Sequence, residues 1–267
     1  MEESQILLNN DHGIASPGQW AAAKALSALG YVTVSAPREQ HSGAGRSVPA
    51  WSDGEIKPTQ LMIGDKEWTC YAMGGSPAQS VLMGIFHVLK RKPDLVVSGI
   101  NYGENPATDI TLSGTVGAAL EAAAAGIPAL AVSLQLDNED YLGYSKETDF
   151  STAAFFTQKF ARLLLEKKMP ADVHALNLNV PIHATPETPW QVTRLGSHPY
   201  FVAYLKEPSE PSGVARIDAK PSPHPDDLAD PATDVHALRV SHMVSVTPLS
   251  LDLTSRVNLE DLQKSME

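Results

Sequence analysis

The sequence predicts an α/β fold: a doubly wound, mostly parallel sheet with helices on both faces and a β-hairpin extension in its C-terminal part. Predicted strands and helices alternate about five times along the first two-thirds of the 267-residue chain, with short connections. Several predicted strands are continuous apolar runs, which is typical of strands buried on both faces. The last third shows no such alternation and is rich in proline, so we expect it to lie outside the sheet core.

The first three predicted elements are a strand, a helix and a second strand. An apolar triplet at 6–8 predicts the first strand, and it runs into the polar loop 9–13, which carries turn residues. The alanine-rich stretch 20–29 follows, with high helix propensity and Gly30 as its stop. The β-branched segment 31–35 predicts the second strand.

The remaining core elements continue the alternation. Ser76 is a predicted N-cap and Pro77 a first-turn proline for a helix that reaches about residue 89. Segment 94–100 is the clearest strand, because its middle is a continuous apolar run. Helices are then predicted at 111–125 and 150–168, and strands at 129–134 and 173–180.

The C-terminal third is organised differently. Segment 185–231 has no sustained helical period, and six of the chain's twenty prolines fall between Pro208 and Pro231. We interpret it as β-hairpins that project from the core and contact another subunit. A strand is predicted at 240–246 and a short last helix at 259–265.

Length and composition predict one domain, residues 1–267, with a core over about 1–184 and an oligomerisation extension over about 185–267. The formal net charge of −11 argues against binding nucleic acid or an anionic membrane, but not against a small phosphate-bearing ligand. Cys70 is the only cysteine, which excludes an intrachain disulfide and a cysteine-built zinc site. No apolar run approaches the roughly 20 residues of a membrane span, and the acidic start lacks a signal-peptide pattern, so a cytoplasmic location is expected.

Polar residues follow several predicted strands, at the edge where such a sheet binds ligands. Asp11 and His12 follow the first strand and offer a carboxylate oxygen and a ring nitrogen to a metal. Ser42 follows the second strand, and Asn101 comes directly after the buried strand. Each residue could instead shape a turn or cap a helix, but all lie on loops that leave the same edge.

A fourth loop carries a candidate anion site. Ser113, Gly114 and Thr115 stand at a predicted helix start, where free N–H groups and the helix dipole favour an anion. Plain N-capping explains Ser113 by itself equally well, and Asn105 is a further candidate phosphate ligand. Metal ligands beside an anion site indicate phosphoryl chemistry.

Short motifs spread over nearly the whole chain form one ordered set. In sequence and order they resemble the survival protein SurE family, metal-dependent 5′/3′-nucleotidases that hydrolyse nucleoside monophosphates. The resemblance implies a SurE-like, Rossmann-like core, a homodimer or homotetramer formed through the extension, and one divalent cation (Mg, Mn, Zn or Co) held at Asp11, the position of His12, Ser42 and Asn101. The motifs lie at 6–14, 17–18, 34–37, 41–43, 75–78, 93–101, 113–119, 126–128, 177–181, 233–235, 237–238 and 245–249.

The main departure from the family pattern is His12, because the family usually has Asp-Asp-Gly there. Asn9 also stands where Ser or Thr is common, and 106–108 replaces a more glycine-bearing stretch. Three outcomes stay open. His12 ligates a transition metal and activity is kept; His12 acts as a general acid or base beside a metal bound by Asp11; or the site has lost its metal and become a binding site or an inactive enzyme.

The resulting hypothesis is hydrolysis of a phosphomonoester, with Asp11, His12 and Asn101 as catalytic residues around a metal-bound water and the amides of 113–115 steadying the phosphate charge. The alternative is a non-catalytic nucleotide- or metabolite-binding protein on the same fold. The Asp-x-Asp of haloacid dehalogenase phosphatases and the Arg-His-Gly of histidine acid phosphatases are not matched at 11–13. A dinucleotide-dependent oxidoreductase is disfavoured, because no Gly-x-Gly-x-x-Gly follows the first strand.

Other residues are expected to have structural roles. The four tryptophans are interpreted as packing or rim residues rather than base-stacking platforms, and Cys70 as buried and inert. Six further histidines lack ligand spacing and are expected to be structural or exposed: His174, His183, His198, His224, His236 and His242.

Overall fold

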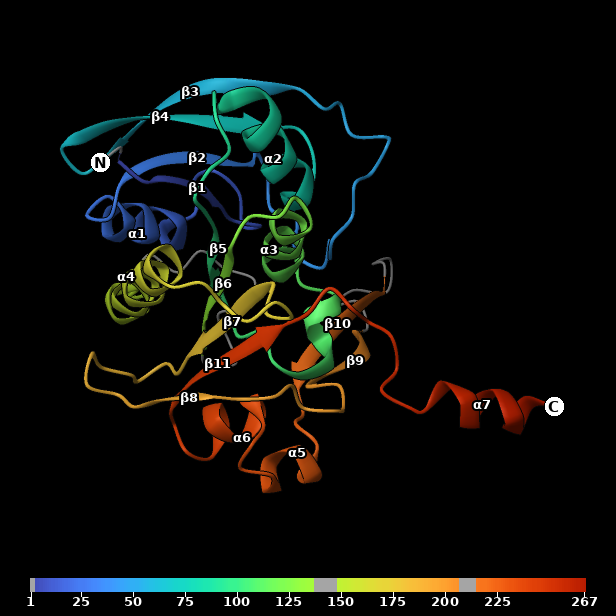
Figure 1. The fold of residues 1–267 in the computed structure, drawn as a ribbon. Coiled ribbons are helices and arrows are strands. Elements are labelled where there is room, and N and C mark those ends of the chain that lie inside the picture. Colours follow the sequence, from blue (N-terminus) through green and yellow to red (C-terminus); the bar gives the residue numbers. More distant parts are fainter. Residues whose placement is uncertain (1–2, 137–147, 207–214) are drawn as a thin grey trace.

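A nine-stranded sheet runs through the described part of the chain (Figure 1). The structure, a computed structural model, describes residues 3–136, 148–206 and 215–267. In the order in which they lie side by side, the strands are β3 (Ile56–Ile63), β4 (Lys66–Met73), β2 (Tyr31–Pro37), β1 (Gln5–Asn9), β5 (Leu95–Tyr102), β6 (Ala129–Leu134), β7 (Ala175–Val180), β11 (Val244–Leu249) and β8 (Trp190–Val192).

The sheet is mostly parallel, as predicted. β1 pairs in parallel with β2 on one side and β5 on the other, and β6 and β7 continue the parallel arrangement. The antiparallel pairs are β3 with β4 and β11 with β7. From β1 the chain goes to β2 on one side and later to β5 on the other, so the strand order reverses there, and ligands of such sheets bind in the crevice at the carboxyl ends of these strands.

Helices cover both faces of the sheet, which makes two hydrophobic cores. Ile6 and Leu8 of β1 belong to the core beneath α1 (Pro17–Leu26) and α4 (Ser151–Glu166). The residue between them, Leu7, belongs to the core beneath α2 (Pro77–Met83) and α3 (Gly114–Ala124). Successive strand residues point to opposite faces, so an unbroken apolar triplet serves both layers.

The predicted core elements are present, with shifted boundaries. α1 begins at Pro17, three residues before the predicted start, and the predicted helix 77–89 is α2 followed by a π-helical turn at Gly84–Val88. Gly84 allows this turn to approach β1 closely, since a Cβ there would lie 2.7 Å from a methyl carbon of Leu7. The β3–β4 hairpin was not predicted, because edge strand β3 is mostly exposed and carries little apolar pattern.

The C-terminal third contains one hairpin and several short elements. β9 (Phe201–Lys206) pairs antiparallel with β10 (Arg216–Pro221), while Pro208 and Pro211 lie outside the described residues. The expectation of hairpins over 185–231 was wrong at α5 (Pro225–Ala229), and a second short helix, α6 (Asp234–Arg239), follows that segment. The predicted strand at 240–246 is β11, four residues later, and α7 (Leu259–Met266) projects from the body (Figure 1). Within the described residues, the search for a helix long and apolar enough to cross a membrane finds none.

Candidate active site

A small cavity of about 170 Å³ lies at the carboxyl ends of β1 and β5. Six of the eight predicted site residues line it, and Gly114 and Thr115 stand just outside. A larger cavity of about 720 Å³ lies at the opposite edge, by the first residues of β6 and β7, and holds none of the predicted groups. The residues that line the small cavity are Asp11, His12, Ser42, Gly43, Asn101, Tyr102, Gly103, Glu104, Asn105, Ser113 and Phe201.

The loop after β1 is shaped by Asn10. Its side-chain oxygen accepts the His12 backbone N–H at 2.8 Å, and its side-chain nitrogen donates to the Ile100 carbonyl at 2.9 Å. The first contact closes a local turn, and the second ties that turn to the end of β5. Asn10 therefore has the structural role open to such residues, while Asp11 and His12 face the cavity.

The start of α3 fixes the position of the Asp11 side chain. Thr115 Oγ1 donates to Asp11 Oδ1 at 2.7 Å, and His12 Nδ1 lies 3.3 Å from the same oxygen. Gly114 is required here, because a Cβ at this position would lie 2.9 Å from the Asp11 Cβ and 3.1 Å from its Oδ2. Thr115 and Gly114 thus meet the site through Asp11 and do not line the cavity.

Asn101 presents an unpaired oxygen. Its Nδ2 donates to the Gly103 carbonyl at 2.8 Å, which fixes the amide plane. Its Oδ1 is buried and has no hydrogen-bond partner among the described residues. A buried acceptor without a partner costs about 1–3 kcal/mol, and a cation supplies what such a carbonyl oxygen lacks. The donor set therefore fits a divalent cation.

The charge of the cavity also fits a divalent cation. Asp11 is 3% exposed and Glu104 2% exposed, and none of the described residues that line the cavity is Lys or Arg. Tyr200 donates its hydroxyl to Glu104 Oε1 at 2.6 Å. Two buried carboxylates repel a phosphate dianion unless a cation lies between them and the phosphate, so an anionic ligand and a metal would have to enter together.

Ser42 and Ser113 come from two loops that touch each other. Gly45 donates its N–H to the Leu112 carbonyl at 2.9 Å, which brings the loop after β2 to the start of α3. Ser113 is the N-cap of α3, and its hydroxyl accepts the Val116 N–H at 3.1 Å. Ser42 is exposed on this loop, so its hydroxyl reaches the cavity from the solvent side.

Comparison with known proteins identifies the family of this chain. The family model "Survival protein SurE" matches residues 6–201. The chain belongs to the SurE family. Proteins named 5′-nucleotidase SurE from Methanosarcina acetivorans and Thermococcus kodakarensis are 41% and 39% identical to it, each over 97% of both chains. The crystal structure of the SurE protein from Aquifex aeolicus superposes with a TM-score of 0.75 at 32% identity, covering 98% of this chain and all of that one.

The structure adds five residues to the cavity lining predicted for this SurE protein: the glycines Gly43 and Gly103 and the side chains of Tyr102, Glu104 and Phe201. The centroids of the Tyr102 and His12 rings are 5.3 Å apart. Glu104 lies in the loop after β5, where only Asn105 was predicted as a ligand. Phe201 comes from the C-terminal third, where Asp109 Oδ2 accepts its backbone N–H at 2.7 Å. No local pattern in the sequence could have linked Phe201 to a loop so distant along the chain.

A SurE motif in β7 acts as a support for Asn105. Asn179 accepts the Asn105 backbone N–H at 2.7 Å, and Asn177 donates to the Asn105 carbonyl at 2.8 Å. The Asn105 side chain donates to Ser133 Oγ at 2.8 Å. Both asparagines of motif 177–181 therefore hold the loop after β5 in place, and neither lines the cavity.

Asp234 of α6 anchors the same loop from the C-terminal third of this SurE chain. Its carboxylate accepts N–H groups from Ala107, Gly196 and Val235 at 2.8–2.9 Å. Burial nevertheless raises the pKa of Asp234 to about 6, from an ordinary value of 3.8, because desolvation outweighs these hydrogen bonds. The folded state thus binds a proton here more tightly than the unfolded state.

The stability that Asp234 contributes should therefore be present in full below pH 4 and be lost as the pH rises through about 6. The expected loss is about 3 kcal/mol of unfolding free energy, because a tenfold change in an acid constant is worth about 1.4 kcal/mol. Urea unfolding of wild type and Asp234→Asn at pH 4.5 and 7.5 measures about 2 kcal/mol of it, because part of the loss lies below pH 4.5. The gap between the two proteins should change with pH, whereas the exposed Asp172→Asn control should follow wild type.

Proposed function

We propose that the protein is a metal-dependent phosphomonoesterase that hydrolyses nucleoside 5′- and 3′-monophosphates. The observation that carries this proposal is the unpaired Asn101 Oδ1 in a cavity that also holds the Asp11 carboxylate. SurE relatives from Methanosarcina acetivorans, Methanosarcina mazei and Thermococcus kodakarensis are named 5′-nucleotidases, which agrees with it.

Asp11, Ser42 and Asn101 would hold the cation, with His12 as a further ligand. When bound, the cation would lower the pKa of a water molecule and neutralise phosphate charge. Thr115 fixes the Asp11 carboxylate through its 2.7 Å hydrogen bond to Oδ1, which would leave Oδ2 for the cation.

The phosphate group would lie against Asn105, Ser113 and the N-terminal end of α3. That helix is 11 residues long, and its first N–H groups and dipole favour an anion. We assign Gly114 a second role besides close packing: its N–H belongs to this end of the helix. Asn105 is fixed by four hydrogen bonds, three at its backbone and one from its side-chain nitrogen, so it would meet the phosphate preorganised.

The nucleoside has room in a neighbouring cavity of about 500 Å³, which shares Ser42 and Gly43 with the first. Trp51 lies on its rim and is 88% exposed. The loop that carries Trp51 is fastened to the N-terminal end of α2, because Gln79 donates to the Pro49 carbonyl at 3.0 Å. A sugar and base attached to the bound phosphate would extend into this cavity.

Phosphate release by metal-stripped protein tests the function. We expect no turnover without metal and recovery with at least one of Mg, Mn, Zn or Co. Nucleoside monophosphates should be hydrolysed with higher kcat/KM than ribose 5-phosphate, because only they fill the second cavity. No turnover with any of the four metals would contradict the proposal. Calorimetry that then finds metal-independent nucleotide binding would favour the non-catalytic binding protein.

We also propose that the chain forms an oligomer through its C-terminal third. Exposed apolar side chains lie on the β9–β10 hairpin at Val202, Leu205 and Ile217, and on α7 at Leu259 and Met266. Such side chains favour burial between subunits, so we assign residues 185–267 to a homodimer or homotetramer. Residues 1–184 would form the catalytic core. A cytoplasmic location stays a prediction.

A further inference from the structure

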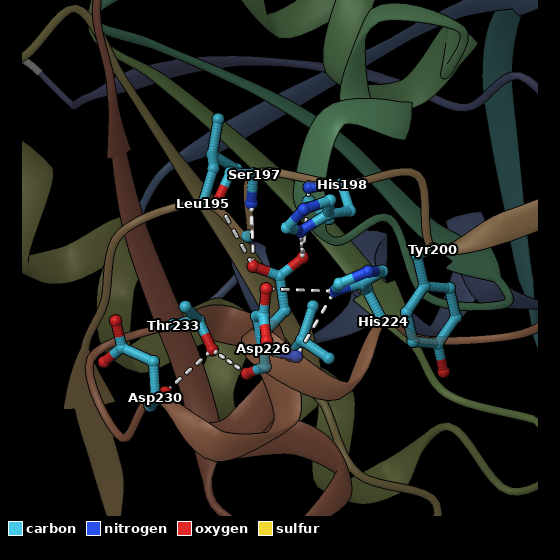
Figure 2. A network of polar contacts seen from close by, with 12 residues as sticks. Leu195, Ser197, His198, Tyr200, His224, Asp226, Asp230 and Thr233 are labelled. Atoms are coloured by element: carbon cyan, nitrogen blue, oxygen red, sulfur yellow. Dashed lines mark hydrogen bonds and ion pairs between the residues drawn. The ribbon is translucent and has the colours of Figure 1, made fainter.

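Two histidines and an aspartate meet at the base of the β9–β10 hairpin (Figure 2). Phe201 pairs with Pro221 at this end of the hairpin. His198 lies three residues before Phe201 and His224 three residues after Pro221, so the strand register, continued outward, places the two histidines opposite each other. This register explains why two histidines without ligand spacing in the sequence come together.

His198 is oriented by a buried carboxylate. Asp227 accepts the His198 ring Nδ1–H at 3.1 Å and also the backbone N–H groups of Ser197 and His198, at 2.9 and 3.0 Å. Asp227 is 2% exposed, so its position is fixed. Because a carboxylate only accepts, Nδ1 carries the ring proton and Nε2 keeps a free lone pair. A carboxylate behind an imidazole is the usual support of a histidine that ligates a metal.

His224 and Asp226 stand beside this oriented ring. The Asp226 backbone N–H donates to His224 Nδ1 at 3.2 Å, so that nitrogen carries no proton, and the Asp226 carboxylate lies 3.7 Å from it. One donor atom from each of His198, His224 and Asp226 lies within 4.8 Å of the other two. Ligands about 2.1 Å from a tetrahedral zinc ion are about 3.4 Å apart, so closure by about an ångström is needed.

The side chains that must move are at the surface. The two imidazole rings are stacked, with centroids 3.7 Å apart and planes 14° from parallel. An imidazole binds a metal in its ring plane, so the His224 ring has to turn out of the stack. Its side chain is 42% exposed and that of Asp226 is 79% exposed, whereas His198 is the fixed member. The open side leaves room for water to complete the coordination.

We propose that His198, His224 and Asp226 form a second metal site, selective for a transition-metal ion such as Zn²⁺ and separate from the Asp11–Asn101 cavity. Two imidazoles and one carboxylate suit zinc, cobalt or nickel better than magnesium. The ion would clamp the two ends of the hairpin to the start of α5. It would thereby brace Tyr200 and Phe201, whose backbone N–H groups bind Asp109 Oδ2 at the edge of the catalytic cavity.

Metal titration of an Asp11→Asn background tests this site whether or not the protein is a phosphatase. Metal-stripped Asp11→Asn protein should bind about one Zn²⁺ per chain by calorimetry, with a rise in melting temperature. Co²⁺ in place of Zn²⁺ should give visible absorption bands from imidazole coordination. Adding His198→Ala or His224→Ala to this background should each weaken Zn²⁺ binding at least about tenfold and remove the Co²⁺ bands.

The matched control is His87→Ala, which removes an exposed histidine from the π-helical turn at Gly84–Val88, far from His198 and His224 in the sequence. It should leave Zn²⁺ binding and the Co²⁺ spectrum unchanged. His224→Gln, at an exposed position, serves if His198→Ala does not fold. An Asp11→Asn protein that binds no Zn²⁺, or binding that survives both histidine substitutions, would overturn the proposal.

Discussion

Replacing Asp11 with asparagine is expected to remove nearly all metal-dependent phosphate release. The substitution keeps the size of the side chain but removes the negative charge that Thr115 holds in place toward the cavity. The loss should exceed the roughly 10–100-fold that removing an outer hydrogen-bond partner costs a metal site. It is measured as kcat/KM for a nucleoside monophosphate at a fixed, high Mn²⁺ concentration.

Thr115→Val gives the graded companion to this experiment. It removes the 2.7 Å hydrogen bond to Asp11 while keeping the shape of the side chain. The Mn²⁺ concentration for half-maximal activity should rise about 10–100-fold, with kcat recovered at saturating metal. Asp172→Asn, on the opposite edge of the sheet, is the control and should behave as wild type. An Asp11→Asn enzyme with wild-type activity would exclude the carboxylate as a ligand.

His12→Asp should change the metal preference of the enzyme. A ring nitrogen favours Zn²⁺ or Co²⁺, whereas a second carboxylate oxygen favours Mg²⁺ or Mn²⁺. Because His12 is 7% exposed and lines the cavity, the new carboxylate would stand beside Asp11. The ratio of Mg²⁺- to Zn²⁺-supported kcat/KM should rise by about tenfold or more, as expected for a change of about 1.4 kcal/mol in relative binding.

The outcome separates the two catalytic roles left open for His12. A changed preference with activity retained assigns it as a metal ligand. Unchanged preference with reduced activity assigns it as an acid or base beside the metal. His87→Asp adds the same charge at an exposed site and should leave the ratio unchanged. Unchanged preference and unchanged activity together would contradict any role for His12 at the site.

Sequence reasoning reached the core of the site because parallel strands end at one edge. Asp11 follows β1, and Asn101 is the last residue but one of the neighbouring strand β5, so their convergence follows from strand pairing alone. The role of Thr115 could not be derived this way. The sequence offered its backbone N–H at a helix start, whereas the structure uses its hydroxyl on Asp11, a contact set by how closely α3 packs on the loop after β1.

The C-terminal third was harder to predict because its elements are short and stabilised by distant partners. α5 and α6 have five and six residues, too few for a helical period to stand out. Asp234 stood in the sequence only as part of motif 233–235, yet its carboxylate holds Ala107 in the loop after β5. Phe201 and the His198–His224 pair depend on the register of the β9–β10 hairpin, which proline-rich sequence does not reveal.

Anomalous scattering from a crystal grown with Mn²⁺ tests the central claim most directly. We expect a manganese peak within bonding distance of both the Asp11 carboxylate and Asn101 Oδ1, because Asn101 lines this cavity and its buried Oδ1 lacks a hydrogen-bond partner among the described residues. If the protein hydrolyses nucleotides but no manganese peak lies between these two side chains, or the peak lies elsewhere, the assignment of this cavity as the metal site is contradicted.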